Sequence, residues 1–251
     1  MRNIKLTLAY DGTDFCGWQV QPDAPSIQGT LASVIERLTG ENVLPQGSGR
    51  TDAGVHALAQ VASFATASPI PVENLAKALN DILPASIRVL ETAEVPADFH
   101  ARKSAKHKTY RYRMYRAALC PPFLARYVWH YPYPLDETGM AESASAVIGE
   151  HDFTSFAAVD PERGTEEEGS SVRRVTSSSW ERSGDEFVYT VSGNGFLHHM
   201  VRNLVGTFLL VGKGTLKPSD ISRILQARGR SAAGATAPAS GLYLVNVDYK
   251  G

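Results

Sequence analysis

The sequence predicts an α+β fold in which two similar α/β sandwich domains share a largely antiparallel central sheet. The order of the expected elements carries this prediction, since the first half gives β-α-β-α-β and the second roughly β-α-β-β-α-α-β. The chain has 251 residues and 43% hydrophobic content, enough to bury a core in one large domain or two ordinary ones. We place the domain boundary after residue 104, which gives domains 1–104 and 105–251.

The first half begins with a half-buried strand over residues 3–10, where apolar side chains alternate with polar or small ones. An amphipathic helix follows Ser26, a favourable N-cap residue, and ends at Gly40. The remaining expected elements are a strand at 57–66, a helix at 72–83 and a strand at 87–95, with room for a further strand near Val43.

The second half begins with the clearest strand of the chain, residues 106–116, in which the period of two is unbroken. The elements expected after it are a helix at 136–148 closed by Gly149, a hairpin of 173–179 and 187–192, an apolar helix at 200–211, a shorter helix at 218–227 and a closing strand at 242–249. Two stretches lack apolar periodicity and are expected to be surface connections. These are 160–171, with four glutamates, and 229–240.

Composition and termini narrow the class of protein. Cys16 and Cys120 lie far apart and form no C-x-x-C pair, which argues against a disulfide framework or a zinc module. The N-terminus carries Arg2 and Lys5 and reaches Asp11 without a signal-peptide core. No apolar run is long enough to span a bilayer. We therefore expect a cytoplasmic protein that does not associate with membranes.

The net charge of −1 hides a strongly basic interval, residues 99–135, which contains no acid. Its cations are Arg102, Lys103, Lys106, Lys108, Arg111, Arg113, Arg116 and Arg126, and aromatic residues alternate with them. Cations that neutralise phosphate, beside rings on which bases stack, are typical of a nucleic-acid interface. The alternative is an exposed basic edge strand whose aromatic residues face the core.

The stretch Gly47–His56 is the main candidate site. Its three glycines allow the backbone to fold tightly around Arg50 and Asp52 and allow a bulky partner to approach. The alternative is a surface turn with one solvated ion pair. An arginine favours the ionised form of a neighbouring carboxyl group, and a carboxylate held near a substrate can act as a nucleophile. Asp52 is therefore the candidate nucleophile. Arg202 is a candidate partner, unless it serves a structural ion pair.

Familiar cofactor and metal motifs do not fit. Neither Gly47–Gly54 nor Gly212–Gly214 has the residue order of a phosphate-binding P-loop. A dinucleotide fingerprint fails because Asp52 takes the place of its third glycine. The neighbours His198 and His199 would diverge by about 100° on a helix, and no third ligand is evident. We expect no cofactor and no metal.

Several stretches, in order along nearly the whole chain, resemble the TruA-type tRNA pseudouridine synthases. They are Tyr10–Thr13 with Gly17–Gln19, Gly49–His56, Phe99–Arg102, Lys108–Tyr112, His198–Asn203 and Gly241–Leu244. The resemblance implies a pseudouridine synthase fold and an isomerase that detaches uracil from its ribose and rejoins it through carbon five. The substrate implied is uridine at positions 38, 39 and 40 in the anticodon stem-loop of tRNA. Neither a cofactor nor a metal is implied.

The resemblance also implies roles for individual residues. Asp52 is expected to be the nucleophile, attacking either the sugar's anomeric carbon or the uracil ring. Tyr110 is expected to pack on the base and to take the carbon-five proton, Arg202 to pair with the aspartate, and Arg50 and Leu242 to contact the flipped nucleotide. The expected RNA contacts are Phe99, His100, Ala101, Arg102, Lys103, Lys106, Lys108 and Arg173.

Family members are homodimers in which the tRNA crosses both subunits, so a homodimer is expected here. The segment 160–171 departs from the family pattern, because it is longer and more acidic than a loop near tRNA should be. Two other functions stay open at this stage. A non-catalytic RNA-binding protein would explain the basic interval but not Asp52, and an aspartyl-nucleophile hydrolase of small molecules would explain Asp52 but not the basic interval.

Overall fold

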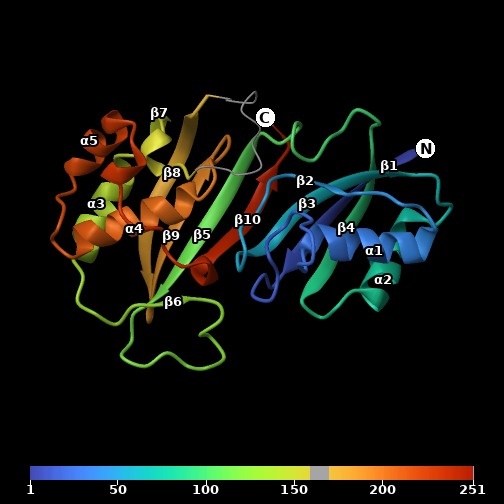
Figure 1. Ribbon diagram of the computed structural model, residues 1–251, viewed down its shortest axis with the longest axis horizontal. Helices are drawn as coiled ribbons and strands as arrows, with labels where there is room; N and C mark the ends of the chain where they lie inside the picture. The colour runs from blue at the N-terminus through green and yellow to red at the C-terminus, as the bar shows by residue number, and fades with distance from the viewer. Residues whose placement is uncertain (159–169, 251) are drawn as a thin grey trace. The chain divides into compact units, whose positions relative to one another are not determined.

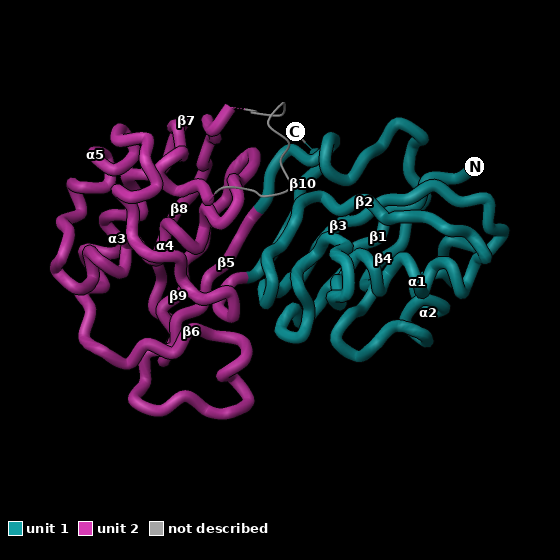
Figure 2. The backbone as a smooth tube through the Cα atoms, in the orientation of Figure 1, with its two compact units in different colours: residues 1–108, 243–251 teal, residues 109–242 magenta. Residues whose placement is uncertain are grey.

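A computed structural model describes residues 1–158 and 170–250 (Figure 1). The chain forms two compact units, coloured separately in Figure 2. Unit 1 comprises residues 1–108 and 243–251, and unit 2 comprises residues 109–242. These units differ from the domains 1–104 and 105–251, chiefly because the closing strand pairs with a strand of unit 1. The division of the chain into domains 1–104 and 105–251 stays a proposal.

Unit 1 is a sheet with two helices on one face (Figure 1). Its strands are β1 (Arg2–Tyr10), β2 (Gln46–Gly47), β3 (His56–Thr66), β4 (Ile87–Val95) and β10 (Leu242–Asp248), and its helices are α1 (Ile27–Thr39) and α2 (Val72–Ile82). The strand order is β4-β1-β3-β10, with the short β2 also paired to β3. β1 runs antiparallel to both neighbours, and β10 runs parallel to β3.

The local sequence explains these elements. In β1, the apolar face predicted from alternation is buried, with Ile4, Leu6 and Leu8 each 0% exposed. Helix α1 begins where the Ser26 hydroxyl accepts a hydrogen bond from the Gly29 N–H at 3.2 Å. It ends at Gly40, whose φ of 75° suits the left-handed cap. The predictions for this strand and this helix are confirmed.

Unit 2 repeats the plan of helices on a sheet. Its strands are most of β5 (His107–Tyr115), then β6 (Trp129–His130), β7 (Gly149–Asp152), β8 (Val172–Ser183) and β9 (Glu186–Gly193). Its helices are α3 (Glu137–Ser145), α4 (Met200–Gly212) and α5 (Asp220–Ala227). Short 3₁₀ turns lie at Thr154–Phe156, Arg230–Ala232 and Ala239–Gly241. The strand order is β5-β9-β8-β7, and β6 lies parallel to β5. Its core joins Trp180, Tyr189 and Phe208, whose rings contact one another.

The predicted fold class is confirmed, since each unit packs helices on a largely antiparallel sheet. Several details differ. The helix expected at 136–148 ends at Ser145, and Gly149, with a φ of 113°, begins β7 instead of closing the helix. The strand expected near Val43 lies at Gln46–Gly47. The short strands β6 and β7 carry too few residues for a periodic pattern.

The acidic segment 160–171 lies outside the described residues except for its last two positions. Within the described part of the chain, no helix has the length and apolar character needed to cross a membrane.

Candidate active site

Asp52 lies in unit 1 on the loop between β2 and β3, and this loop packs directly on the backbone of residues 12–18. The Trp18 N–H donates to the Thr51 carbonyl at 3.0 Å. A Cβ at Gly17 would lie 2.6 Å from the same carbonyl oxygen, and Gly17 has a φ of 91°. Only glycine satisfies both conditions, so the close approach of the two loops depends on it.

A second glycine contact holds the far end of the loop. A Cβ at Gly12 would lie 1.9 Å from the Val55 carbonyl oxygen. The Val55 N–H donates to the Asp52 carbonyl at 3.1 Å, which closes a turn in which Gly54 has a φ of 76°. The backbone on both sides of Asp52 is therefore fixed, while the Asp52 side chain is half-buried.

Buried polar side chains support the loop from the sheet. The Tyr10 and Thr51 hydroxyls are 2.9 Å apart and share a hydrogen bond. The Gln60 amide accepts from the Ser48 hydroxyl at 2.6 Å and donates to the Gly49 carbonyl at 2.9 Å. Burial raises the pKa of Tyr10 to about 12, so its hydroxyl stays protonated at neutral pH. We call Tyr10, Thr51, Gln60 and Ser48 the loop network.

Two further residues join the loop to its surroundings. The Lys108 ammonium donates to the Ser48 carbonyl at 2.6 Å, so this predicted RNA contact also braces the loop. The His56 ring accepts from the Gly12 N–H at 3.1 Å and stacks on Tyr243 with centroids 4.8 Å apart. Arg50, in contrast, is exposed at the loop surface.

The other predicted catalytic residues lie in unit 2. Tyr110 is on β5 and is 7% exposed, and its ring meets Phe196 edge to face with centroids 4.9 Å apart. Arg202 is half-buried near the start of α4, where its Nε donates to the Ala237 carbonyl at 2.8 Å. Leu242, expected to contact the nucleotide, is 5% exposed at the start of β10.

A buried tyrosine also lies near Arg202. Burial raises the pKa of Tyr112, and the positive charge of Arg202 partly offsets that increase. The Tyr112 hydroxyl donates to the Pro238 carbonyl at 2.8 Å. In unit 2 the structure thus brings Arg202 together with a segment, residues 229–240, that the sequence analysis treated only as an irregular connection.

The expected RNA contacts differ in accessibility. Arg102, Lys103 and Lys106 are exposed and Phe99 and His100 half-buried. Ala101 is 0% exposed; its N–H donates to the Ser63 hydroxyl and its carbonyl accepts from the Tyr249 hydroxyl. The cations beside Ala101, rather than Ala101 itself, can therefore reach a phosphate.

Two arginines of the basic interval 99–135 pair with acids of unit 2, and Arg173, a further expected RNA contact, bonds to the backbone. Arg113 pairs with Glu186 at 2.5 Å and Arg116 with Glu137 at 3.1 Å. Arg173 donates to the carbonyl of Val172 at 2.7 Å. The acid-free interval therefore overstates the positive charge available to a partner, because Glu186 and Glu137, which lie elsewhere in the chain, pair with two of its arginines.

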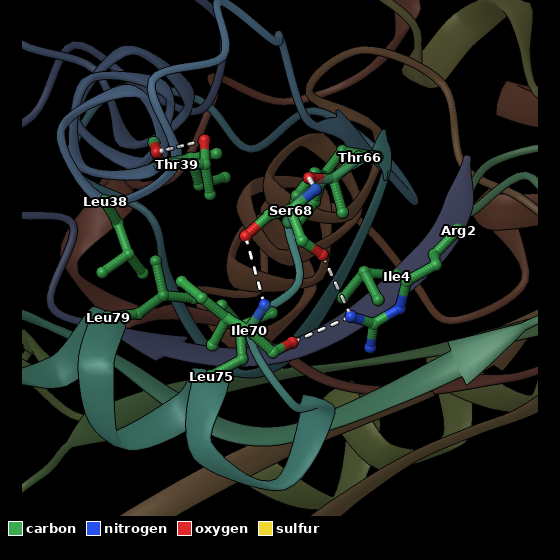
Figure 3. A pocket seen from close by; sticks show the side chains of 11 residues that line it. Arg2, Ile4, Leu38, Thr39, Thr66, Ser68, Ile70, Leu75 and Leu79 are labelled. Carbon is green, nitrogen blue, oxygen red and sulfur yellow. Dashed lines mark hydrogen bonds between the residues drawn. The ribbon is translucent and has the colours of Figure 1, made fainter.

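The cavity shown in Figure 3 is separate from the Asp52 loop. It lies between α1, α2 and the sheet of unit 1 and is lined mostly by apolar side chains, including Ile4, Ile35 and Leu79. None of its lining residues belongs to 10–18 or 47–56. It also lacks convergent polar groups, since the Arg2 guanidinium at its edge donates to the carbonyls of Ser68 and Ile70.

Several residues of this site carried no role in the sequence prediction. Tyr10 and Asn203 stand within motifs of the family resemblance but received no individual role there. Gln60 was assigned only to a strand, and Thr236 only to an irregular connection. Strand periodicity marks Tyr10 as inward-facing but does not show which polar group it meets. The only signal for Gln60 was a polar residue inside an apolar strand, which becomes informative once burial is known.

Known proteins resemble this chain over nearly its whole length. The family described as tRNA pseudouridine synthase matches residues 7–102 and 144–250. A tRNA pseudouridine synthase A of Solibacter usitatus is 53% identical over 250 residues, covering 99% of this chain and 100% of the relative. The protein of the same name from Moorella thermoacetica is 49% identical, covering 98% of this chain and 99% of that relative. The chain therefore belongs to the tRNA pseudouridine synthase family.

Proposed function

We propose that this enzyme acts on uridines 38, 39 and 40 in the anticodon stem-loop of tRNA, with Asp52 as its nucleophile. As a family member the chain isomerises uridine in tRNA. The proposal adds the positions modified and the residues responsible. The observation that carries it is the Asp52 loop, whose backbone is fixed on both sides while the Asp52 side chain is only half-buried.

The reaction assigns a step to each proposed residue. The bond from uracil N1 to the ribose C1′ breaks, the base turns, and C5 bonds to C1′. A proton then leaves C5, and N1 gains one, so the product is an isomer of the substrate. Asp52 attacks either C1′ or the uracil ring and is released when the new bond forms. Tyr110 packs on the base and takes the C5 proton, and Arg202 pairs with the carboxylate. Arg50 and Leu242 hold the flipped nucleotide.

A base inside a stem has to be extruded before a carboxylate can reach its glycosidic bond. Contacts with the tRNA backbone therefore have to supply free energy for extrusion, and recognition relies on shape and phosphate contacts. The exposed cations Arg102, Lys103 and Lys106 are suited to this role. We further propose that the protein is cytoplasmic and acts as a homodimer on which one tRNA crosses both subunits.

The direct test is tritium release from tRNA labelled at carbon five of uridine. We expect Asp52→Asn to lower the rate at least about 1,000-fold, because the amide keeps the shape of the side chain but is not a nucleophile. The matched control is Asp81→Asn, which removes an exposed carboxylate of α2 that pairs with Lys77 at the surface. Equal activity of wild type and Asp52→Asn would refute the nucleophile assignment.

The RNA interface is tested separately from the chemistry. We expect replacement of Arg102, Lys103 and Lys106 by Gln to weaken tRNA binding and to reduce the salt dependence of the association constant by about 2 to 3 logarithmic units per decade. The control is Arg113→Gln, since Arg113 is already paired with Glu186. Filter binding over a salt series gives both values. An unchanged salt slope in the triple variant would place the tRNA elsewhere.

A further inference from the structure

The segment 229–238 lies along α4, and we call it the strap. Its contact with the helix is a backbone-to-backbone approach at two glycines. A Cβ at Gly206 would lie 1.7 Å from the Ala235 carbonyl oxygen, and a Cβ at Gly234 would lie 2.6 Å from the Gly206 carbonyl oxygen. The Gly234 N–H also donates to the Thr207 hydroxyl at 2.9 Å. At these two glycines the backbone of the strap therefore approaches the backbone of the helix directly.

The strap ends in a two-way contact with Arg202. The Ala237 carbonyl accepts from Arg202 Nε at 2.8 Å, and the Ala237 N–H donates to the Arg202 carbonyl at 3.1 Å. A bond at Nε fixes the plane of the guanidinium group, whose other donors are on its two terminal nitrogens. The direction in which those terminal nitrogens point therefore depends on where the strap holds Ala237.

Asn203, the next residue of α4, holds the strap in place. It is 0% exposed, and its Oδ1 accepts from the Thr236 hydroxyl at 2.7 Å and from Arg230 at 3.0 Å. Its Nδ2 donates to the Phe156 carbonyl at 2.7 Å. One buried amide thus joins both ends of the strap to the 3₁₀ turn at Thr154–Phe156, and Thr236 is the residue before Ala237.

We propose that Asn203 is a positioning residue for the isomerisation, which acts by holding Thr236 and Ala237 so that the guanidinium of Arg202 is aimed at its reaction partner. This proposal rests on the proposed role of Arg202. A buried side chain that bonds to the strap on one side and to the core on the other provides the kind of support that a catalytic arginine requires.

The orientation itself is measured by NMR of the arginine Nε–H groups, with the Arg202 signal assigned from its loss in Arg202→Lys. We expect a distinct, slowly exchanging Arg202 Nε–H in the wild type, because that proton is bonded to the Ala237 carbonyl. In Asn203→Ala and in the milder Thr236→Val, the signal is expected to move toward those of exposed arginines and to exchange at least about 10-fold faster. This readout does not depend on activity.

The effect on the reaction is measured by single-turnover tritium release. We expect each variant to lower the maximal rate about 10-fold or more while the tRNA affinity changes less than about 3-fold. Added to Arg202→Ala, the Asn203→Ala substitution should lower the rate no further, since Asn203 acts through Arg202. The control is Ser178→Ala, which removes an equally buried hydrogen bond, to Tyr189, in the same unit.

Each outcome decides something different. An unchanged Arg202 signal in both variants overturns the proposal, and so do multiplicative rate losses in the double variant. A rate loss of the same size in Ser178→Ala would show that general loosening of unit 2 is sufficient. An inactive wild type would refute the proposed function alone, because the NMR measurement still reports whether Asn203 positions Arg202.

Discussion

The two units hold their proposed catalytic residues in different ways. In unit 1, the Asp52 loop is fixed by glycine contacts with residues 12–18 and also by the loop network rising from β1 and β3. In unit 2, Arg202 belongs to a regular helix, and its Nε donates to the Ala237 carbonyl of the irregular strap. The first arrangement is built into the sheet, whereas the second is added to the surface of a helix.

Because the two supports differ, we expect substitutions in them to affect the free energy of unfolding and the reaction rate in different proportions. Damage to the support of the Asp52 loop disturbs buried residues of two central strands, so it should lower the free energy of unfolding and the reaction rate together. Damage to the strap leaves α4 and the core of unit 2 intact, so it should lower the rate more than the stability. The predictions below test that separation.

The largest effects are expected from the two glycines that permit close approach. Gly17→Ala combines a positive φ with a contact of 2.6 Å to the Thr51 carbonyl, and we expect it to cost about 3 kcal/mol or more and to abolish activity. In Gly206→Ala, a helix-propensity gain of about 1 kcal/mol offsets part of the clash with the strap. We therefore expect Gly206→Ala to lose activity with a smaller loss of stability.

Urea unfolding and tritium release on the same preparations measure both effects. Gly40→Ala is the control for Gly17→Ala, because Gly40 has a similar positive φ of 75° but no atom within 4 Å of its Cβ position. It reports the backbone strain without the clash. Equal losses of stability in Gly17→Ala and Gly206→Ala would remove the distinction between the two supports.

Sequence predicts this molecule best where a local pattern determines the structure. The alternation of β1 and the Ser26 cap of α1 are complete within a few residues, so both were predictable. The Asp52 loop was predicted as a site from the spacing of its glycines and from the resemblance of Gly49–His56 to a family motif. The strap shows no periodicity, and its role depends on Gly206 and Asn203, which lie far from it along the chain.

The basic interval shows the limit of local reasoning most clearly. An interval without acids predicts free positive charge only if no acid arrives from elsewhere in the fold. Glu186, 73 positions from Arg113, and Glu137, 21 positions from Arg116, do so, and neither partner is visible from spacing. The hydrogen bonds of the loop network also cannot be predicted from spacing, since Tyr10 and Thr51 are 41 positions apart.

An intermediate effect is expected at Gln60, the amide of the loop network. Gln60→Leu leaves the buried Ser48 hydroxyl and the Gly49 carbonyl without their present partner, at a cost of about 2 to 4 kcal/mol. Because these groups support the Asp52 loop, we expect the reaction rate to fall about 10-fold or more in parallel.

The matched control for Gln60 is Asn80→Leu. Asn80 also bridges backbone groups with a side-chain amide, both of them on Val89, but it lies on α2 away from the loop. Chemical unfolding and single-turnover rates of the two variants give the comparison. A similar loss of stability with unchanged activity is expected for Asn80→Leu, and the same result for Gln60→Leu would contradict a role in holding Asp52.

The smallest effects at neutral pH are expected from the buried tyrosines of the two supports. Tyr10→Phe removes the hydrogen bond with Thr51 and the longer one from Gln60, and Tyr112→Phe removes the bond to the Pro238 carbonyl, each variant at a cost of about 1 kcal/mol. The two variants should differ in one respect: Tyr10→Phe should change mainly the Asp52 loop, whereas Tyr112→Phe should loosen the strap and lower the reaction rate more than the stability.

High pH sharpens this last comparison. Burial raises the pKa of Tyr10 to about 12, and raises that of Tyr112 as well, so both contribute stability that is complete below the unfolded value of about 10 and is lost as pH rises. The free energy of unfolding should therefore fall between pH 10 and 12 in the wild type and fall less steeply in either Phe variant. Urea unfolding at pH 9, 10 and 11 tests this. If the free energy of unfolding fell equally steeply with pH in Tyr10→Phe and in the wild type, the Tyr10 hydroxyl of the wild type would not titrate on unfolding.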